Sequence, residues 1–132
     1  MDNTLLIWKY LRPLLTENQE LTEYISKDNI YPLIAPSDTP YPFIIYKRDN
    51  LNPEYTKPLF GGWTNRIQVS ISVYSDNYDE CITIANLVRN ILEGYYYSNN
   101  EITIHPIELS STYESYSENG FLQNLIFNIT AE

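Results

Sequence analysis

Residues 66–94 contain a change of hydrophobic period that constrains the fold more than any other feature of the sequence. The stretch RIQVSISVY (66–74) alternates apolar and polar residues without a break, which predicts a strand with one buried face. After SDN, apolar residues recur every three or four positions, which predicts a helix. The apolar stripe of this helix consists of Cys81, Ile84, Ala85, Val88, Ile91 and Leu92. The strand positions that alternate with polar residues are Ile67, Val69, Ile71 and Val73. We therefore expect the strand to bury this face against the helix.

Both ends of this helix carry recognisable signals. Asp76 or Asn77 is placed to cap its N-terminus, and Asp79-Glu80 lies in the first turn, where the helix dipole favours negative charge. This position accounts for the carboxylate pair without a catalytic role. Gly94 follows the last turn and is expected to end the helix.

The flanking sequence predicts further short elements. Residues 4–12 have helical spacing through Leu5, Trp8 and Leu11 or Arg12, with Asp2 or Asn3 as cap, and Pro13 is expected to kink or restart that helix. Thr16 and Gln19 form a capping-box pattern that opens a second short helix. The extended segments and loops predicted from composition are 30–34 (extended), 35–42 (proline loop), 43–48 (strand), 51–65 (projecting connection), 102–109 (strand), 110–120 (polar connection) and 122–129 (strand).

These elements predict an α+β fold. Its sheet is mixed but largely antiparallel, a long helix and the N-terminal helices pack on one face, and residues 51–65 form a projecting loop or hairpin. A chain of 132 residues fits a single domain spanning residues 1–132.

Charge and composition limit the function classes. Eight basic and seventeen acidic residues give a net charge of -9, which offers no electrostatic basis for gripping a phosphate backbone. The N-terminal segment breaks its apolar run with Lys9 and Arg12, so we expect neither a signal peptide nor a membrane span, and production in a reducing cytoplasm.

No catalytic, cofactor or metal site is predicted. Cys81 is the only cysteine; it lies on the apolar stripe, where a core position is expected rather than a reactive thiol. His105 is the only histidine, is expected in a strand, and has no cysteine or second histidine to complete a metal site. The chain is therefore interpreted as a non-enzyme.

Aromatic residues are the candidate contact residues. The sequence holds thirteen tyrosines, and a side chain with a large apolar face and a polar tip suits an interface. The candidates on the projecting segment and in the tyrosine run are Tyr55, Phe60, Trp63, Tyr95, Tyr96 and Tyr97. Phe60 and Trp63 have burial within the subunit as an equal alternative, and one ring of the tyrosine run is expected in the core.

Three stretches resemble the tail-completion or tail-terminator proteins of long-tailed bacteriophages. They are LTEYISKDNIYPLIAPSDTPYPFIIYKR, RIQVSISVYSDNYDECITIANLVRNILEG, and the polar loop followed by LQNLIFNIT. Together they cover most of residues 20–130. Residues 51–65 match no pattern of the family, and the run YYY (95–97) stands where the family tends to be polar.

The resemblance implies a structural virion protein made in the host bacterial cytoplasm. Such proteins form a homo-oligomeric ring, six-fold or of another symmetry, at the head-proximal end of the tail. The ring ends the tail tube and joins it to neck or connector proteins. The net charge of -9 adds the hypothesis that a negative inner wall lets DNA pass through the lumen without specific binding. Three other interpretations stay open: a neck or connector ring nearer the portal, a small non-viral binding or adaptor module, and a glycosidase that uses only Asp and Glu.

Overall fold

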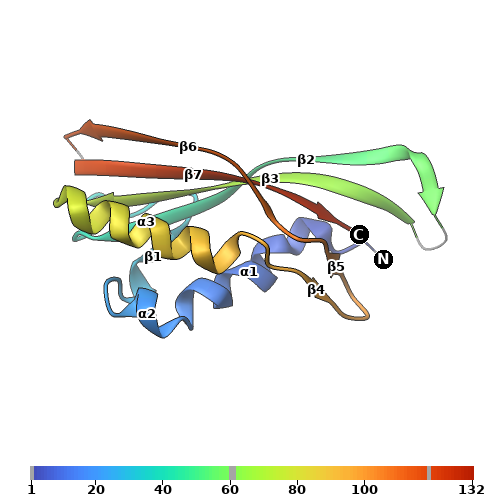
Figure 1. Ribbon diagram of the computed structural model, residues 1–132, viewed down its shortest axis with the longest axis horizontal. Coiled ribbons are helices and arrows are strands. Elements are labelled where there is room, and N and C mark those ends of the chain that lie inside the picture. Colours follow the sequence, from blue (N-terminus) through green and yellow to red (C-terminus); the bar gives the residue numbers. More distant parts are fainter. Residues whose placement is uncertain (1, 60–61, 119) are drawn as a thin grey trace.

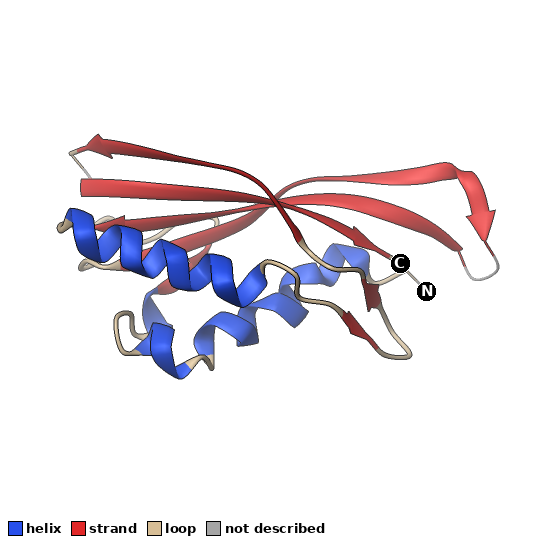
Figure 2. Ribbon diagram, viewed as in Figure 1, coloured by secondary structure: helices blue, strands red, loops and turns tan. Residues whose placement is uncertain are grey.

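The computed structural model describes residues 2–59, 62–118 and 120–132. Within them a curled sheet forms one layer and the helices form the other, all on one face of the sheet (Figure 1; Figure 2). The elements are η1 (Thr4–Leu6), α1 (Ile7–Thr16), α2 (Gln19–Thr22), η2 (Lys27–Asn29), β1 (Ile30–Pro32), β2 (Phe43–Leu59), β3 (Gly62–Ser75), α3 (Tyr78–Leu92), β4 (Tyr97–Ser98), β5 (Thr103–Ile104), β6 (Glu108–Ser117) and β7 (Gly120–Ala131).

The strands of the described residues form one seven-stranded sheet. Its order is β1-β2-β3-β7-β5-β4, and β6 pairs with β7 along the same edge as β5. The β1–β2 pair is parallel and the others are antiparallel. The predicted α+β class, with a largely antiparallel sheet and helices on one face, is confirmed.

The predicted strand and helix of residues 66–94 are confirmed and form the centre of the core. On β3 the four alternating positions are at most 1% exposed: Ile67, Val69, Ile71 and Val73. They face the buried stripe of α3, which consists of Cys81, Ile84, Ala85, Val88 and Leu92. Phe127 of β7 belongs to the same apolar cluster. The period-2 strand and the period-3.6 helix thus bury complementary faces.

The ends of α3 follow the sequence signals. The Asn77 side chain accepts a hydrogen bond from the Glu80 backbone N–H at 2.9 Å. Gly94 has a φ of +84°, a left-handed conformation that glycine adopts without steric cost. The chain therefore leaves the helix where the glycine stands.

The first helix differs from its prediction in two respects. Helix α1 continues through Pro13 to Thr16. The carbonyl of Lys9, which Pro13 leaves without its helical partner, belongs to an exposed residue, so water can satisfy it. The buried face consists of Ile7, Leu11 and Leu15, whereas Leu5, which was expected to face inward, is 63% exposed.

The cap of the second helix also lies two residues later than predicted. Asn18 accepts from the Leu21 backbone N–H at 3.0 Å and starts α2. The hydroxyl of Thr16 instead donates to the Arg12 carbonyl at 3.3 Å, because α1 has continued to that residue.

Residues 51–65 are strand rather than a loop, wherever the structure describes them. They extend β2 and β3 into a long hairpin that reaches beyond the helices (Figure 1). We call residues 47–66 the arm. Pro53 is tolerated in β2 because this part of the strand has no neighbour on its outer side among the described residues. The expected projection is thus a hairpin.

The polar stretch 110–120 was also predicted wrongly as a connection. Its residues up to Ser117 belong to β6, which pairs with β7 from Glu108 onward. Nearly every side chain of β6 is exposed, so this strand has no apolar alternation from which to recognise it.

Candidate interaction surfaces

Two candidate contact residues form a pair on the arm. The rings of Tyr55 and Trp63 meet edge to face with centroids 5.3 Å apart, a favourable aromatic geometry. Tyr55 is 65% exposed and Trp63 is 44% exposed. Neither belongs to the apolar core or packs against it. Trp63 thus lies outside the apolar core of the described residues, and its contact with another molecule stays a prediction. Phe60 lies outside the described residues.

The tyrosine run divides as expected between interior and surface. Tyr95 packs against the core, and burial raises the pKa of its hydroxyl. Tyr96 is 72% exposed and Tyr97 is 38% exposed. Their role in an interface is untested.

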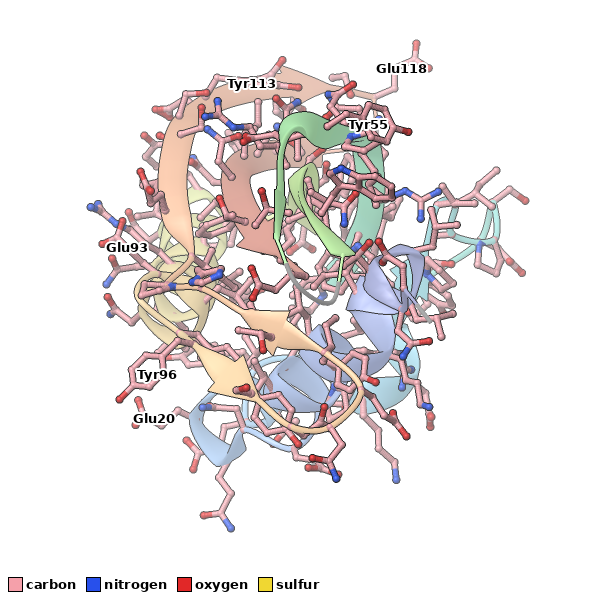
Figure 3. All side chains as sticks on the ribbon, turned by 90° about the vertical axis from the view of Figure 1, so that its right-hand side faces the viewer. Glu20, Tyr55, Glu93, Tyr96, Tyr113 and Glu118 are labelled. Atoms are coloured by element: carbon pink, nitrogen blue, oxygen red, sulfur yellow. The ribbon has the colours of Figure 1, made fainter. Side chains whose placement is uncertain are left out.

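The two groups of candidates occupy separate surfaces. Tyr55 lies on the sheet side of the molecule and Tyr96 lies near β4 on the helix side (Figure 3). The structure therefore does not bring the described candidates into one patch. If both groups make contacts, they meet different partners or different parts of one partner.

An apolar turn after β1 is a surface that the sequence did not predict. Leu33 and Ile34 are 73% and 77% exposed. The Ile34 N–H donates to the Pro32 carbonyl at 2.7 Å, and Leu33 has a φ of 67°, which is a tight and strained γ-turn. A second bond, from the Leu33 N–H to the Tyr46 carbonyl at 2.9 Å, anchors the turn to β2. Two apolar side chains are thus held outward on a fixed turn, a feature of contact surfaces.

Strand β6 presents two further exposed rings, Tyr113 at 54% and Tyr116 at 70%. The strand is tied to the start of α3, since the Tyr78 hydroxyl donates to both Glu114 carboxylate oxygens at 2.7 and 3.0 Å. This hydrogen bond raises the pKa of Tyr78. Both tyrosines can be read from the sequence, but because residues 110–120 were predicted to be a connection, their position on a strand was not expected.

The sheet face away from the helices is polar and hydrogen-bonded. Asp49 accepts from the Ser70 hydroxyl at 2.5 Å and from the Gln68 amide at 3.2 Å. The Ser72 hydroxyl donates to Asn124 at 2.7 Å. A shallow groove of about 500 Å³ on this face is lined largely by amide and charged side chains, among them Asn50, Asn52, Arg66, Gln68, Glu108 and Asn128. Such a surface suits hydrogen bonding to a polar partner more than enclosure of a small apolar ligand.

The groups with potential chemistry stand apart from one another. Cys81 is fully buried, and burial raises the pKa of its thiol to about 11, so it carries no thiolate near neutral pH. His105 directly follows β5 and lies 3.4 Å from a Glu132 oxygen on the surface. Among the described residues no three histidine, cysteine or acidic side chains gather as a metal site.

None of the helices in the described ranges has the length and hydrophobicity to cross a bilayer. The longest, α3, has 15 residues, whereas about 20 are needed.

Comparison with known proteins gives a family and a fold. The family described as tail completion protein gp17 matches residues 9–131. Among solved structures, a chain from the virion of a native gene transfer agent (GTA) particle superposes with a TM-score of 0.76. The two share 15% sequence identity, and the match covers 93% of this chain and 90% of the other. At that identity the likeness concerns the fold. No curated protein matches the sequence significantly.

Proposed function

Since this chain belongs to the tail completion protein gp17 family, a family of phage tail structural proteins, we propose that it forms a ring at the head-proximal end of the tail. There it terminates the tail tube and joins the tube to the neck. The observation that carries the proposal is the family match over residues 9–131. Among the described residues no group of side chains is arranged for catalysis, which fits a structural role. We propose that the protein is not an enzyme. We also propose that residues 1–132 act as one domain.

The shape of the subunit supports a ring. A closed ring of identical copies needs two different surfaces on each subunit that meet head to tail. The sheet has two unlike edges: β6 lies along one, and β1 with β2 lies along the other. The arm continues β2 and β3 past the helices at one end of the sheet (Figure 1). Different surfaces on opposite sides allow each copy to contact two neighbours.

The exposed aromatic residues are proposed as contacts to other proteins. Large aromatic side chains dominate the energetics of interfaces. Tyr55 and Trp63 on the arm are proposed for a neighbouring subunit, and Tyr96 and Tyr97 for the tube or the neck. Phe60 is included because it falls in the same arm segment of the sequence.

The net charge of -9 is proposed to serve DNA passage. A wall of negative charge repels the phosphate backbone, so DNA moves through the lumen without specific binding. The protein is made in the host cytoplasm and then becomes part of the virion.

Assembly with purified tail tubes tests this function. The protein is incubated with tubes of its own phage and imaged by negative stain, and the mass of any free oligomer is measured in solution. We expect a closed ring on one end of each tube and no further tube growth from that end. Rings that bind portal or connector complexes but not tubes would instead identify a neck protein. A subunit that stays monomeric with both partners would favour a small adaptor outside the virion.

A further inference from the structure

The outer side of β6 is an open strand edge. From Glu108 to Tyr116 the strand pairs with β7 on one side, and no described strand lies on its other side. The edge carries Tyr113 and Tyr116 but no proline, lysine or arginine. Natural proteins use those residues to keep open edges from pairing. The one interruption of β6 is an irregularity of register between Leu109 and Ser111, at its start.

The outer side of β2 is different. Strand β1 covers it at residues 44–46. Beyond that point it carries a bulge between Arg48 and Asn50, and Pro53. Both features interrupt backbone pairing. We therefore expect the arm to make contacts through its side chains.

Charge is distributed unevenly between these two sides. The arm holds four of the eight basic residues of the chain and two of the seventeen acidic ones. Its net charge is therefore +2 in a chain of net charge -9. Residues 67–132 contain a single lysine or arginine, Arg89. Within one copy Arg66 and Glu108 line the same groove, so the contrast between the two edges is that β2 carries Lys47 whereas β6 carries only acidic charged residues. This contrast favours contact between the arm of one copy and β6 of another.

The basic side chains of the arm are accessible. Lys47 and Arg66 have side chains that are 52% and 75% exposed. Their present partners, Asp49 and Glu54, are in the same hairpin. Ion pairs whose cation is exposed to solvent add little stability, so Lys47 and Arg66 can share a second acidic partner at little cost.

The strand directions are compatible with such a contact. The four long strands alternate in direction across the sheet in the order β2, β3, β7, β6. With an even number, β2 and β6 run antiparallel, and this also holds between neighbouring copies in the same orientation. By register Glu108 of β6 is level with Asn50 of β2, so the neighbouring copy is displaced along the strands until its residues beyond Asn50 lie beside β6. Contact of one side with the other is head to tail, and it forms a ring when the rotation between copies closes.

We propose that the arm of one copy lies along β6 of a second copy. In this contact Lys47 and Arg66 meet acidic residues at the β6 edge: Glu108 and Glu114 of the strand, and Glu118 just after it. Tyr55 and Trp63 of the arm pack near Tyr113 and Tyr116. Tyr113 and Glu118 lie on the sheet side of the molecule, as Tyr55 does (Figure 3). The inference rests on the proposed ring and names the surfaces that close it.

A charge-swap experiment tests the contact. Variant A carries Glu108→Lys and Glu118→Lys, and variant B carries Lys47→Glu and Arg66→Glu. Glu114 is left unchanged because it holds the Tyr78 hydroxyl. Alone, each variant opposes like charges at the contact, and we expect its association constant to fall about tenfold or more. Mixed in equal amounts, A and B alternate with opposite charges at every contact, and assembly returns to within about threefold of the wild type. Sedimentation velocity and negative stain, with and without tail tubes, measure the assembly.

The outcomes separate the contact from the proposed function. If wild type forms rings on tubes while A and B each assemble as well as wild type, or if both fail and mixing does not restore them, the contact is wrong and the ring stands. If wild type forms no ring in any of these conditions, the proposed function fails and the contact with it. Unfolding midpoints of A and B within a few degrees of wild type establish that the variants fold. If B forms rings as well as wild type but retains less DNA than wild type, the arm is a nucleic-acid contact and the inference is overturned.

Discussion

The arm and the helix-backed region show two ways of building one sheet. The helix-backed region consists of residues 67–92 and β7; there, one face of each strand is covered and its alternating side chains are buried. The arm continues the same two strands past the helices, and its aromatic pair stays exposed. In the first region apolar burial holds the strands. At the base of the arm, Leu51 packs against the core and Asn65 is buried and bonds to Asp2. Beyond these two residues the described strands are held mainly by their hydrogen-bond ladder, which leaves exposed side chains such as Tyr55 available for contact with partners.

The largest expected effect lies in the helix-backed region. Phe127 is fully buried, and Phe127→Ala removes its ring from the core and leaves a cavity. We expect a loss of about 3–5 kcal/mol in the free energy of unfolding, measured by denaturant titration. If this variant does not fold, Ile71→Val in the same cluster has an expected cost of about 0.5–1.5 kcal/mol. A loss near zero in Ile71→Val would place the stability of the subunit elsewhere.

Two glycines at the ends of the helix-backed region test how much a close backbone approach adds to the cost of a substitution. Gly120 has a φ of +93°, and a Cβ there would stand 2.8 Å from the Ser75 carbonyl oxygen. Gly94 has a φ of +84° with nothing within 4 Å of that position. Gly120→Ala combines a clash with an unfavourable conformation, so we expect a cost above about 2 kcal/mol. Gly94→Ala carries the conformational cost alone, about 1–2 kcal/mol. Equal losses in the two variants would show that the close approach at Gly120 relaxes.

The cap of α3 gives a smaller effect. Asn77→Ala removes the acceptor for the Glu80 N–H, with an expected loss of about 1 kcal/mol in the free energy of unfolding. Asn86→Ala, an exposed position inside the same helix, is the matched control and is expected to be neutral or slightly stabilising. Equal losses in both would mean that the cap hydrogen bond contributes nothing measurable.

How far the sequence predicted this molecule depends on the same contrast. Where a strand buries one face, as at Val69 and Ile71, local period and burial agree and the prediction was correct. In the arm, Pro53 and the diglycine at 61–62 are sequence signals for a loop. The strands there do not alternate apolar and polar residues, because neither face is buried, so the loop signals decided the prediction. Strand β6 was missed for the same reason. A strand that is polar on both faces has no local sequence pattern by which to recognise it. The position and register of β6 are set by its pairing with β7.

The candidate contact residues divide in a similar way. Tyr55 and Trp63 were recognisable because large aromatic residues on a projecting segment have few other uses. Leu33 was not, because an apolar residue next to a short strand is ordinarily predicted to be buried. Its exposure follows from the γ-turn at that position, which depends on the Tyr46 carbonyl of β2. Distant backbone contacts of this kind are not visible in local sequence.

The most informative test has the smallest effect on the isolated subunit. Trp63→Ala removes a ring that is 44% exposed and whose neighbour is Tyr55. Because the core is untouched, we expect the free energy of unfolding to fall by less than about 1 kcal/mol, while ring assembly on tail tubes is impaired. Tyr24→Ala, which removes a ring of similar exposure at 43%, is the matched control, and we expect it to leave ring assembly on tail tubes unchanged. A large loss of stability in Trp63→Ala would show that the arm is part of the folded core, and the division between a region for stability and a region for contact would fail. Intact assembly together with intact stability would leave the arm as a projection whose aromatic pair has no partner in the ring.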